Sequence, residues 1–493
     1  MREKLLLIAV TLVTFGATLL GSFHFDDYAL LSDRVITAAD GWWRAWMPLQ
    51  TRPLTWFTFW ANFQVGGPPV VWHAVNLGLH CACVLAAYSA LRRILGGRTA
   101  WVAAALFAVH PIAAEPVAYV SARGTLLAAL FCLLSLRSWL AGSRWTAVAY
   151  FAAALLGKEE CAAFPVFLLA LHWSVSKDRK ELPPIAAMFA LSLAAGLRVI
   201  WASTQVAGSG VGQSAGITAA GYLSAQGVVI LRYLRMLVLP YGFTPDPEIT
   251  TPGAWVSIVA WLAVGCAAAI ALRWSAKARA GFWFLGGLIL LAPSSSIFPA
   301  ADLAADRRMY LPLVAFAACA ALWLSQADQR IALALIASLG LISIRQSMIW
   351  RTEESLWTEA VRLAPSKIRP RIQLARALPW HRAIVVLEEA KRIAPEDPEL
   401  ASEEGRVHLS AARPELALQA FGRALAMRPG DAKAFNNRGA ALLALGQNDA
   451  AQSDFEAALR RDPCLLDARR NLRTIGFDDR TKYPWPASCS NAP

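Results

Sequence analysis

The chain has 493 residues, of which 57% are hydrophobic and 16% charged, and its mean hydropathy is +0.43. Soluble globular proteins are usually about 45–50% apolar and about 25% charged, so this composition excludes an ordinary soluble domain and indicates a membrane protein. The 47 Lys and Arg residues outnumber the 34 Asp and Glu residues, which gives a net charge of +13. The basic residues form small groups between apolar stretches, as in cytoplasmic membrane loops, and no block typical of nucleic-acid binding occurs.

The first apolar run, 5–20, follows the basic residues Arg2 and Lys4. No small-residue cleavage site precedes His24 and many apolar runs follow, so we expect an uncleaved helix with a cytoplasmic N-terminus. Ten further runs are expected to cross the membrane: 72–91, 99–109, 126–140, 145–156, 162–173, 185–201, 255–272, 282–291, 311–324 and 331–344. Several are shorter than the roughly 20 residues that a bilayer requires, so their ends must extend.

The apolar stretch 222–239 is expected not to cross, because Arg232 and Arg235 lie within it and charges facing lipid are costly. With eleven spans, every expected cytoplasmic loop contains Lys or Arg, as the positive-inside tendency requires. These loops are 92–98, 142–144, 177–182, 273–279 and 326–330. The chain after residue 350 then lies outside; if 222–239 crossed, that tail would be cytoplasmic.

The composition changes after about residue 350, which divides a membrane domain, 1–350, from a charged, Ala-rich region. Prolines 365, 395, 429 and 463 are separated by 30, 34 and 34 residues, and 34 is the period of tetratricopeptide repeats. Gly405 with Phe421 and Gly439 with Phe455 occupy equivalent positions. We therefore expect an α-solenoid of three helix pairs over 351–470, the first shortened by four residues, and a C-terminal tail, 471–493. Such an array binds a protein partner on its concave surface or serves as a rigid spacer.

Polar residues collect at the expected outer ends of the spans, where they are candidates for function. Asp26 and Asp27 follow the first span and offer a general base with a partner that orients it or binds a metal, although such a pair is also a common helix N-cap. His110 and Glu115, followed by Arg123, lie at a proline-broken end of the third span, where irregular backbone must line protein or water. They either bind sugar or a cation or form a polar contact at a kink.

Further charged candidates are Lys158 and Glu159 between the fifth and sixth spans, Arg232 and Arg235 in the non-crossing stretch, and Arg307, Arg308 and Tyr310 at the start of the tenth span. Lys158 and Glu159 form a simple loop or sit in a cavity. Arginines outside oppose the positive-inside tendency, so we expect an anion, and lipid phosphate matches guanidinium geometry. For Arg307 and Arg308, salt bridges to Asp302 or Asp306 are the alternative. Residues 73, 76 and 80 share one helical face and indicate contacts between helices.

Several motifs occur in a fixed order ahead of the repeats: Phe25-Asp26-Asp27, Arg52-Pro53-Leu54-Thr55, His73-Ala74-Val75-Asn76-Leu77 with His80, His110-Pro111 with Glu115, Lys158-Glu159, Tyr233-Leu234-Arg235, and Arg307-Arg308-Met309-Tyr310-Leu311-Pro312. In this order the chain resembles the TMTC-type (transmembrane and tetratricopeptide repeat) protein O-mannosyltransferases over nearly its whole length. One departure is Thr125, in Ala122-Arg123-Gly124-Thr125-Leu126-Leu127, where the family tends to read Gly-Arg-Ala-Asp-Leu-Leu.

The resemblance implies an all-α membrane glycosyltransferase of the GT-C class. Its donor is a polyprenyl- or dolichyl-phosphate-linked sugar such as mannose, and its acceptor is a Ser or Thr hydroxyl of a protein on the non-cytoplasmic face. We expect Asp27 or Asp26 to act as the base and arginines to neutralise the leaving phosphate, with a divalent cation optional. The expected substrate-binding residues are His110, Glu115, Arg123, Lys158, Glu159, Arg232, Arg235, Arg307, Arg308 and Tyr310.

Two other functions remain open. A non-catalytic scaffold would recruit envelope proteins through the repeats but gives no reason for arginines and paired aspartates on one face. A transporter of a lipid-linked intermediate would carry its charges at mid-span. High Ala, Arg and Trp usage and compact loops favour a bacterial inner membrane with periplasmic repeats. Cys464 and Cys489 lie in the polar tail and can pair only in an oxidising compartment.

Overall fold

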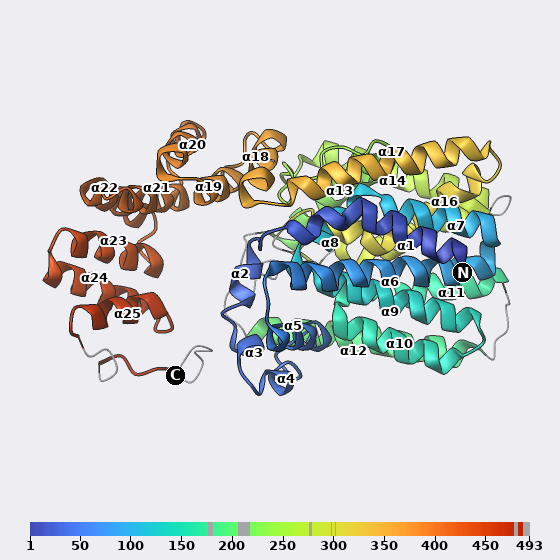
Figure 1. Ribbon diagram of the computed structural model, residues 1–493, viewed down its shortest axis with the longest axis horizontal. Coiled ribbons are helices and arrows are strands. Elements are labelled where there is room, and N and C mark those ends of the chain that lie inside the picture. The colour runs from blue at the N-terminus through green and yellow to red at the C-terminus, as the bar shows by residue number, and fades with distance from the viewer. Residues whose placement is uncertain are drawn as a thin grey trace. The chain divides into compact units, whose positions relative to one another are not determined.

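The computed structural model describes residues 1–175, 181–205, 217–275, 279–296, 298–300, 302–477 and 482–486. Across these residues the regular elements are helices, so the expected all-α fold is confirmed. The chain divides into two compact units, Met1–Thr352 and Glu353–Pro493. Figure 1 shows long helices in the first unit and short helix pairs in the second. Residues 177–180 of the expected loop 177–182, residues 276–278 of the loop 273–279, and parts of the tail, including Cys489, lie outside the described residues.

The first unit is a bundle built around α7, whose Ala-rich sequence leaves room for close neighbours. Ala103, Ala104, Ala105 and Ala108 of this helix are completely buried, and α7 packs against α1, α6, α16 and α17. The long helices of the bundle are α1 (Arg2–Phe15), α6 (Pro69–Leu95), α7 (Gly97–Val109), α9 (Arg123–Leu140), α10 (Arg144–Gly157), α11 (Phe164–Val175), α12 (Leu182–Gln205), α13 (Ala219–Val238), α14 (Ala254–Ser275), α15 (Arg279–Leu291), α16 (Tyr310–Leu324) and α17 (Gln329–Ile349).

Short helices fill the connections at one end of this bundle, the end that lies opposite the N-terminus in Figure 1. We call it the loop end. The α-helices there are α2 (Asp26–Leu30), α3 (Arg34–Thr37), α4 (Gly41–Arg44), α5 (Pro53–Val65) and α8 (Ala114–Ala118). The 3-10 turns that matter for the site are η2 (Pro111–Ala113), η3 (Val120–Ala122), η4 (Glu159–Cys161), η7 (Ala292–Ser295) and η8 (Asp306–Met309).

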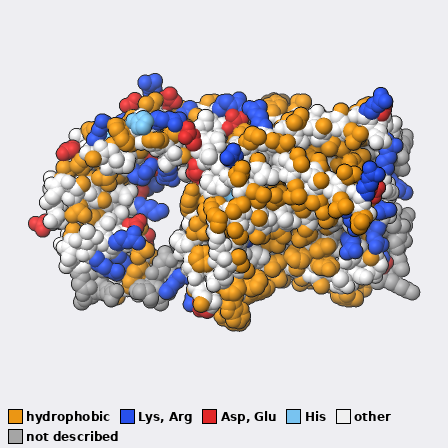
Figure 2. All heavy atoms as spheres, viewed as in Figure 1, with side chains coloured by type: hydrophobic (Ala, Val, Ile, Leu, Met, Phe, Trp, Pro, Cys, Tyr) orange, Lys and Arg blue, Asp and Glu red, His pale blue; other side chains and the backbone are white. Residues whose placement is uncertain are grey.

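Seven segments of the described chain are long and apolar enough to cross a membrane, and the bent pair α7 and α8 makes an eighth when it is counted as one span. Figure 2 shows hydrophobic side chains covering the sides of the bundle. The chain is therefore an integral membrane protein. With 14, 12 and 13 residues, α10, α11 and α15 fall short of a full span. The expected total of eleven spans thus stays a prediction.

The helix α13 lies across the loop end rather than running through the bundle. Near its start, the Tyr222 hydroxyl donates to the carbonyl of Ser294 at 2.8 Å, just after α15. Near its end, the carbonyl of Leu237 lies 3.5 Å from Nε2 of His110, just after α7. Both ends of α13 thus contact connections at the same end of the bundle. This placement agrees with the expectation that 222–239 does not cross the membrane.

The second unit contains the three expected helix pairs, and two glycines show why they pack as tetratricopeptide repeats do. A Cβ atom at Gly405 would lie 2.7 Å from the ring of Phe421, and one at Gly439 would lie 2.7 Å from the ring of Phe455. Only glycine leaves room for the aromatic ring at these positions. The helices are α18 (Glu353–Leu363), the pairs α19 (Ile368–Ala377) with α20 (Trp380–Ile393), α21 (Pro398–Ser410) with α22 (Pro414–Met427) and α23 (Ala432–Ala444) with α24 (Asn448–Arg461), and α25 (Leu466–Thr474).

Candidate functional site

Charged side chains and one tyrosine from four separate connections lie together at the loop end of the bundle. We call this set the loop-end cluster: Asp26, Asp27, Arg52, Glu115, Tyr119, Lys158, Glu159, Glu160, Arg307 and Arg308. Its members lie between α1 and α5, between α7 and α9, between α10 and α11, and between α15 and α16. Direct hydrogen bonds and ion pairs join these connections to one another, so motifs that are far apart in the sequence meet at one place.

The two aspartates stand next to each other in the first turn of α2 but have opposite environments. The Asp27 side chain is 1% exposed and accepts hydrogen bonds from the backbone N–H of Ser121 at 2.8 Å, the Ser121 hydroxyl at 2.6 Å and the backbone N–H of His24 at 3.1 Å. Asp26 is exposed and accepts a hydrogen bond from the Tyr119 hydroxyl at 2.9 Å. Successive helical residues point about 100° apart, which separates the two carboxylates.

Burial raises the pKa of Asp27 to about 6, even though its hydrogen bonds to Ser121 and His24 act in the opposite direction. Its carboxylate is occupied by donors from two loops and fastens α2 to η3. Asp26 is the carboxylate that remains accessible to an incoming group. The geometry therefore favours Asp26 over Asp27 as the residue that can accept a proton from a substrate.

Arg307 and Glu115 form the central ion pair of the cluster. The guanidinium Nη1 of Arg307 lies 2.6 Å from Oε1 of Glu115, and the backbone N–H of Arg307 donates to Oε2 at 3.0 Å. Nη2 lies 3.8 Å from the Asp302 carboxylate. The Glu115 side chain is 6% exposed, whereas that of Arg307 is 25% exposed. Arg307 thus keeps part of its guanidinium open to an anion while its backbone and one nitrogen hold Glu115.

A second pair of charge contacts joins α5 to the connection after α10. Arg52 makes two hydrogen bonds, at 2.9 and 2.5 Å, to the carboxylate of Glu159. Burial acts to raise the pKa of Glu159, but the neighbouring guanidinium prevails and lowers it to about 2. Lys158 lies 2.8 Å from Glu160 and donates to the Thr125 hydroxyl at 2.9 Å. Thr125, which stands where the resembling family tends to carry Asp, therefore acts as a neutral acceptor for Lys158.

Arg308 reaches away from Arg307, towards α13. Its Nη1 donates to the Tyr222 hydroxyl at 3.0 Å and its Nη2 to the carbonyl of Asp302 at 2.8 Å. Together with Glu160 and Thr125, Arg308 lines a cavity of about 20 Å³. Most of its donors are occupied by protein groups, so Arg308 has less capacity for a new anion than Arg307.

The two arginines of α13 also differ in how far protein groups occupy their donors. Arg232 lies 2.5 Å from the Asp306 carboxylate and donates to the carbonyl of Gly242 at 2.9 Å. The Asp306 carboxylate was expected as an alternative partner of Arg307 or Arg308, but it pairs with Arg232. Arg235 is exposed, and its guanidinium stacks on the Tyr241 ring at 4.4 Å.

Three of the expected substrate-binding residues are buried and make contacts within the protein, and their role in binding stays a prediction. Arg123 is completely buried and donates to the side-chain oxygens of Asn76 at 2.9 Å and Asn62 at 2.8 Å, which fastens α9 to α5 and α6. Nδ1 of His110 accepts the N–H of Ile112 at 3.2 Å and so caps η2. The Tyr310 hydroxyl lies 2.6 Å from Nδ1 of His80, which joins α16 to α6. Each of these buried side chains has hydrogen-bond partners within the protein. The position of a polar residue near the end of an apolar run does not show whether it will bind such a partner or a ligand.

Three members of the cluster were absent from the expected site. The sequence could have indicated Arg52, because it is another arginine on the expected outer side. It gave no comparable indication for Tyr119 or Glu160, since an aromatic residue near a helix end and a second glutamate in a loop are common. Asn76 and His80 make the contacts between helices that their spacing indicated.

Two small cavities lie beside the cluster. A second cavity, lined by Glu115, Asp306 and Trp350, has a volume of about 10 Å³, and each of these two cavities has room for about one water molecule. Over the described part of the chain, no three His, Cys, Asp or Glu side chains come together in a way that would hold a metal ion. The accessible part of the cluster is its outer face, where Asp26, Arg52 and Arg307 are exposed or partly exposed.

No family model matches the chain. The human protein O-mannosyl-transferase TMTC4 is 34% identical over 162 residues, which cover 27% of this chain and 22% of that protein. The protein O-mannosyl-transferase F38B6.6 of Caenorhabditis elegans is 30% identical over 154 residues, again 27% and 22% of the two chains. Human TMTC1 is 34% identical over 152 residues, 27% of this chain and 17% of that protein. These relatives confirm the resemblance to the TMTC-type proteins over about 27% of this chain and about a fifth of their own length, and its expected extent over nearly the whole chain stays a prediction.

Among solved structures, a thermophilic tetratricopeptide repeat protein from Thermus thermophilus is 20% identical and covers 32% of this chain and 89% of its own, with a TM-score of 0.24. That score is too low to support a conclusion. The description of the repeats rests on the helix pairs and on the packing of Phe421 and Phe455 against their glycines.

Proposed function

We propose that this chain is a membrane glycosyltransferase that moves a hexose such as mannose from a polyprenyl-phosphate-linked donor to Ser or Thr hydroxyls of a protein. The observation that carries the proposal is the loop-end cluster, which contains an exposed carboxylate, Asp26, held by Tyr119, together with the partly exposed guanidinium groups of Arg52 and Arg307. The names of the relatives support the same reaction class. A lipid-linked donor is supported by the position of the cluster at the end of a membrane bundle.

In the proposed reaction, Asp26 takes the proton of the acceptor hydroxyl as its oxygen attacks the anomeric carbon of the sugar. The bond between that carbon and the phosphate oxygen breaks, and the lipid phosphate leaves with the electron pair. The Tyr119 hydroxyl donates to Oδ2 of Asp26 and so holds the carboxylate in one orientation. Asp27 positions the loop through Ser121 and His24 rather than touching the substrate.

The leaving phosphate needs cations with free donors, because negative charge grows on it as the bond breaks. Arg307 and Arg52 meet this requirement best, with 25% and 41% of their side chains exposed. Glu115 and Glu159 hold these two guanidinium groups in place. Arg308 and Lys158 are more enclosed and contribute positive potential rather than direct contacts. A divalent cation is optional because phosphate is already a good leaving group.

We place the loop end and the repeats on the non-cytoplasmic side, in a bacterium the periplasm. Cys464, in the second unit, is disulfide-bonded, whereas the six described cysteines of the first unit are free. Disulfides persist in oxidising compartments. Figure 2 shows Lys and Arg side chains gathered at the bundle end that holds the N-terminus, which supports a cytoplasmic location for that end.

The test is transfer of labelled mannose from polyprenyl-phosphate mannose to Ser- and Thr-containing peptides, with the full-length protein in membranes. We expect Asp26→Asn to lower the rate by about 100-fold or more, the usual effect of removing a general base. Asp27→Asn is expected to lower it less, because that residue acts through the loop. Equal activity of Asp26→Asn and wild type would remove Asp26 from the chemistry. If the wild-type protein transfers none of several lipid-linked hexoses, the scaffold function is the better account.

A further inference from the structure

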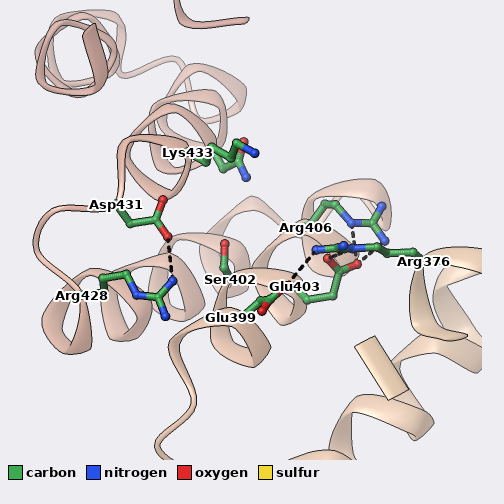
Figure 3. Close-up of a pocket in the computed structure, with 9 residues that line it drawn as sticks. Arg376, Glu399, Ser402, Glu403, Arg406, Arg428, Asp431 and Lys433 are labelled. Carbon is green, nitrogen blue, oxygen red and sulfur yellow. Dashed lines mark hydrogen bonds and ion pairs between the residues drawn. The ribbon is translucent and has the colours of Figure 1, made fainter. Parts of the chain in front are cut away.

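The second unit contains a large open cavity on one face of its repeats. It has a volume of about 710 Å³, within the range of about 300–1,000 Å³ typical of ligand sites. The lining comes from the first helix of each pair and from the turn before α23: Arg376, Glu399, Ser402, Glu403, Arg406, Arg428, Asp431, Lys433 and Asn437. Figure 3 shows these side chains pointing into one space, with Ser402 between two ion-paired groups. We call this space the repeat groove.

Two of the three carboxylates of the repeat groove are engaged by the protein itself. Glu403 is 3% exposed and receives a hydrogen bond from Arg376 at 2.9 Å and another from Arg406 at 2.6 Å. Asp431 caps α23 by accepting the backbone N–H of Ala434 at 3.0 Å. The third, Glu399, is 55% exposed and lies 3.7 Å from Arg376. An incoming cation would therefore have to compete with close partners for Glu403 and Asp431.

Two basic groups of the repeat groove are less engaged. Lys433 is exposed and, within the described chain, forms no ion pair with a carboxylate. Arg428 has a side chain that is 58% exposed and lies 4.0 Å from Asp431, at the limit of an ion pair. Nearby, Asn437 offers a side-chain amide, which can donate to the backbone carbonyl of an extended peptide. The free hydrogen-bonding capacity of the repeat groove is thus mainly that of cationic and neutral donors.

We propose that the repeat groove binds an extended, acidic segment of a protein, with Lys433 and Arg428 contacting its carboxylates. Charge complementarity selects such a segment over a neutral or basic one, because a basic side chain would meet Lys433 and Arg428 while Glu403 and Asp431 are already engaged. If the proposed function holds, the acceptors are proteins whose Ser or Thr sites lie near Asp- and Glu-rich segments.

The test is peptide binding by the full-length protein in nanodiscs of neutral lipid, without any sugar donor. Three fluorescent peptides share one Ser- and Thr-containing sequence with Asp and Glu, Asn and Gln, or Lys at the same positions. We expect the acidic peptide to bind about tenfold more tightly than the amide peptide, equivalent to about 1.4 kcal/mol. High salt should reduce the difference, because exposed charge contacts are screened.

The decisive variant combines Arg428→Glu with Lys433→Glu, and it should remove the preference for the acidic peptide and favour the Lys peptide. A matched control combines Arg362→Glu with Arg470→Glu, which changes the net charge equally. Both control arginines are exposed and paired with an acid three residues away, as Arg428 is, but they do not line the repeat groove. Retained preference in the groove variant, or equal loss in the control, would overturn the inference.

The two proposals fail in different ways. Acidic preference in binding without any sugar transfer would reject the glycosyltransferase and keep the repeat groove as an acidic-segment site. Sugar transfer by a protein that binds all three peptides equally would reject the inference and keep the enzyme.

Discussion

The loop end of the bundle and the repeat groove are both rich in ion pairs, but the pairs are built differently. At the loop end, Arg52 pairs with Glu159 across 107 residues, and Arg307 with Glu115 across 192. In the second unit, Arg406 pairs with Glu403 on the same helix and Arg376 with Glu403 on the next repeat. One region thus depends on distant loops meeting, and the other on a local repeat.

Burial separates the two regions further. Glu115 and Asp306 of the loop end are almost fully enclosed, and Glu403 of the repeats is as enclosed as they are. The difference lies in the arginines: Arg232 and Arg307 are 12% and 25% exposed, whereas Arg376 and Arg428 are 41% and 58% exposed. The arginines of the repeats therefore keep more contact with water, which suits a surface that binds different segments.

The largest expected difference between the regions follows from Arg307→Ala. It leaves the buried carboxylate of Glu115 unpaired, and we expect the free energy of unfolding to fall by about 3–5 kcal/mol. In the second unit, Arg470→Ala removes a pair exposed on both sides and should change stability by less than about 0.5 kcal/mol. Thermal unfolding of both variants in the same detergent checks this. Equal shifts would mean that the loop-end pair is not buried in solution.

The pH dependence of stability tests the unusual position of Asp27. Its pKa is raised from about 3.8 to about 6 by folding, so the folded protein binds the proton more tightly than the unfolded chain. Stability should therefore fall as the pH rises from about 4 to 6 and then level off. The change is about two pH units, at about 1.4 kcal/mol each, or roughly 3 kcal/mol. Unfolding temperatures of wild type and Asp27→Asn across this range should differ in slope; parallel curves would show that Asp27 is not buried.

A smaller effect is expected from filling the space under an aromatic ring of the repeats. In Gly439→Ala the new Cβ lies 2.7 Å from the Phe455 ring, and we expect a loss of about 1–3 kcal/mol from overpacking. Gly422→Ala is the control, because nothing lies within 4 Å of its new Cβ and alanine favours the helix. Circular dichroism during heating compares the two. A stable Gly439→Ala protein would show that the ring can move aside.

Much of the fold could be predicted, and the site only in part. The spacing of prolines, Gly405 and Gly439 predicted the helix pairs, because each pair is stabilised by contacts within about 34 residues. The charges in 222–239 favoured a helix that does not cross the membrane, and the contacts of both ends of α13 at the loop end agree with this expectation. Which of the two carboxylates, Asp26 or Asp27, is buried could not be predicted, because it depends on Ser121 approaching α2 from another loop. Arg123 and Tyr310 were placed in the expected site; the structure buries both between helices, which their sequence positions did not predict.

The amino-acid sequence by itself determined an apolar bundle followed by amphipathic repeats, because hydrophobic periodicity and the spacing of glycine and proline act over one or two helices. Only the tertiary structure decided which carboxylate reaches solvent and which guanidinium groups keep free donors. That outcome depends on desolvation and on partners that the fold brings together from distant loops, and the spacing of residues along the chain determines neither of them.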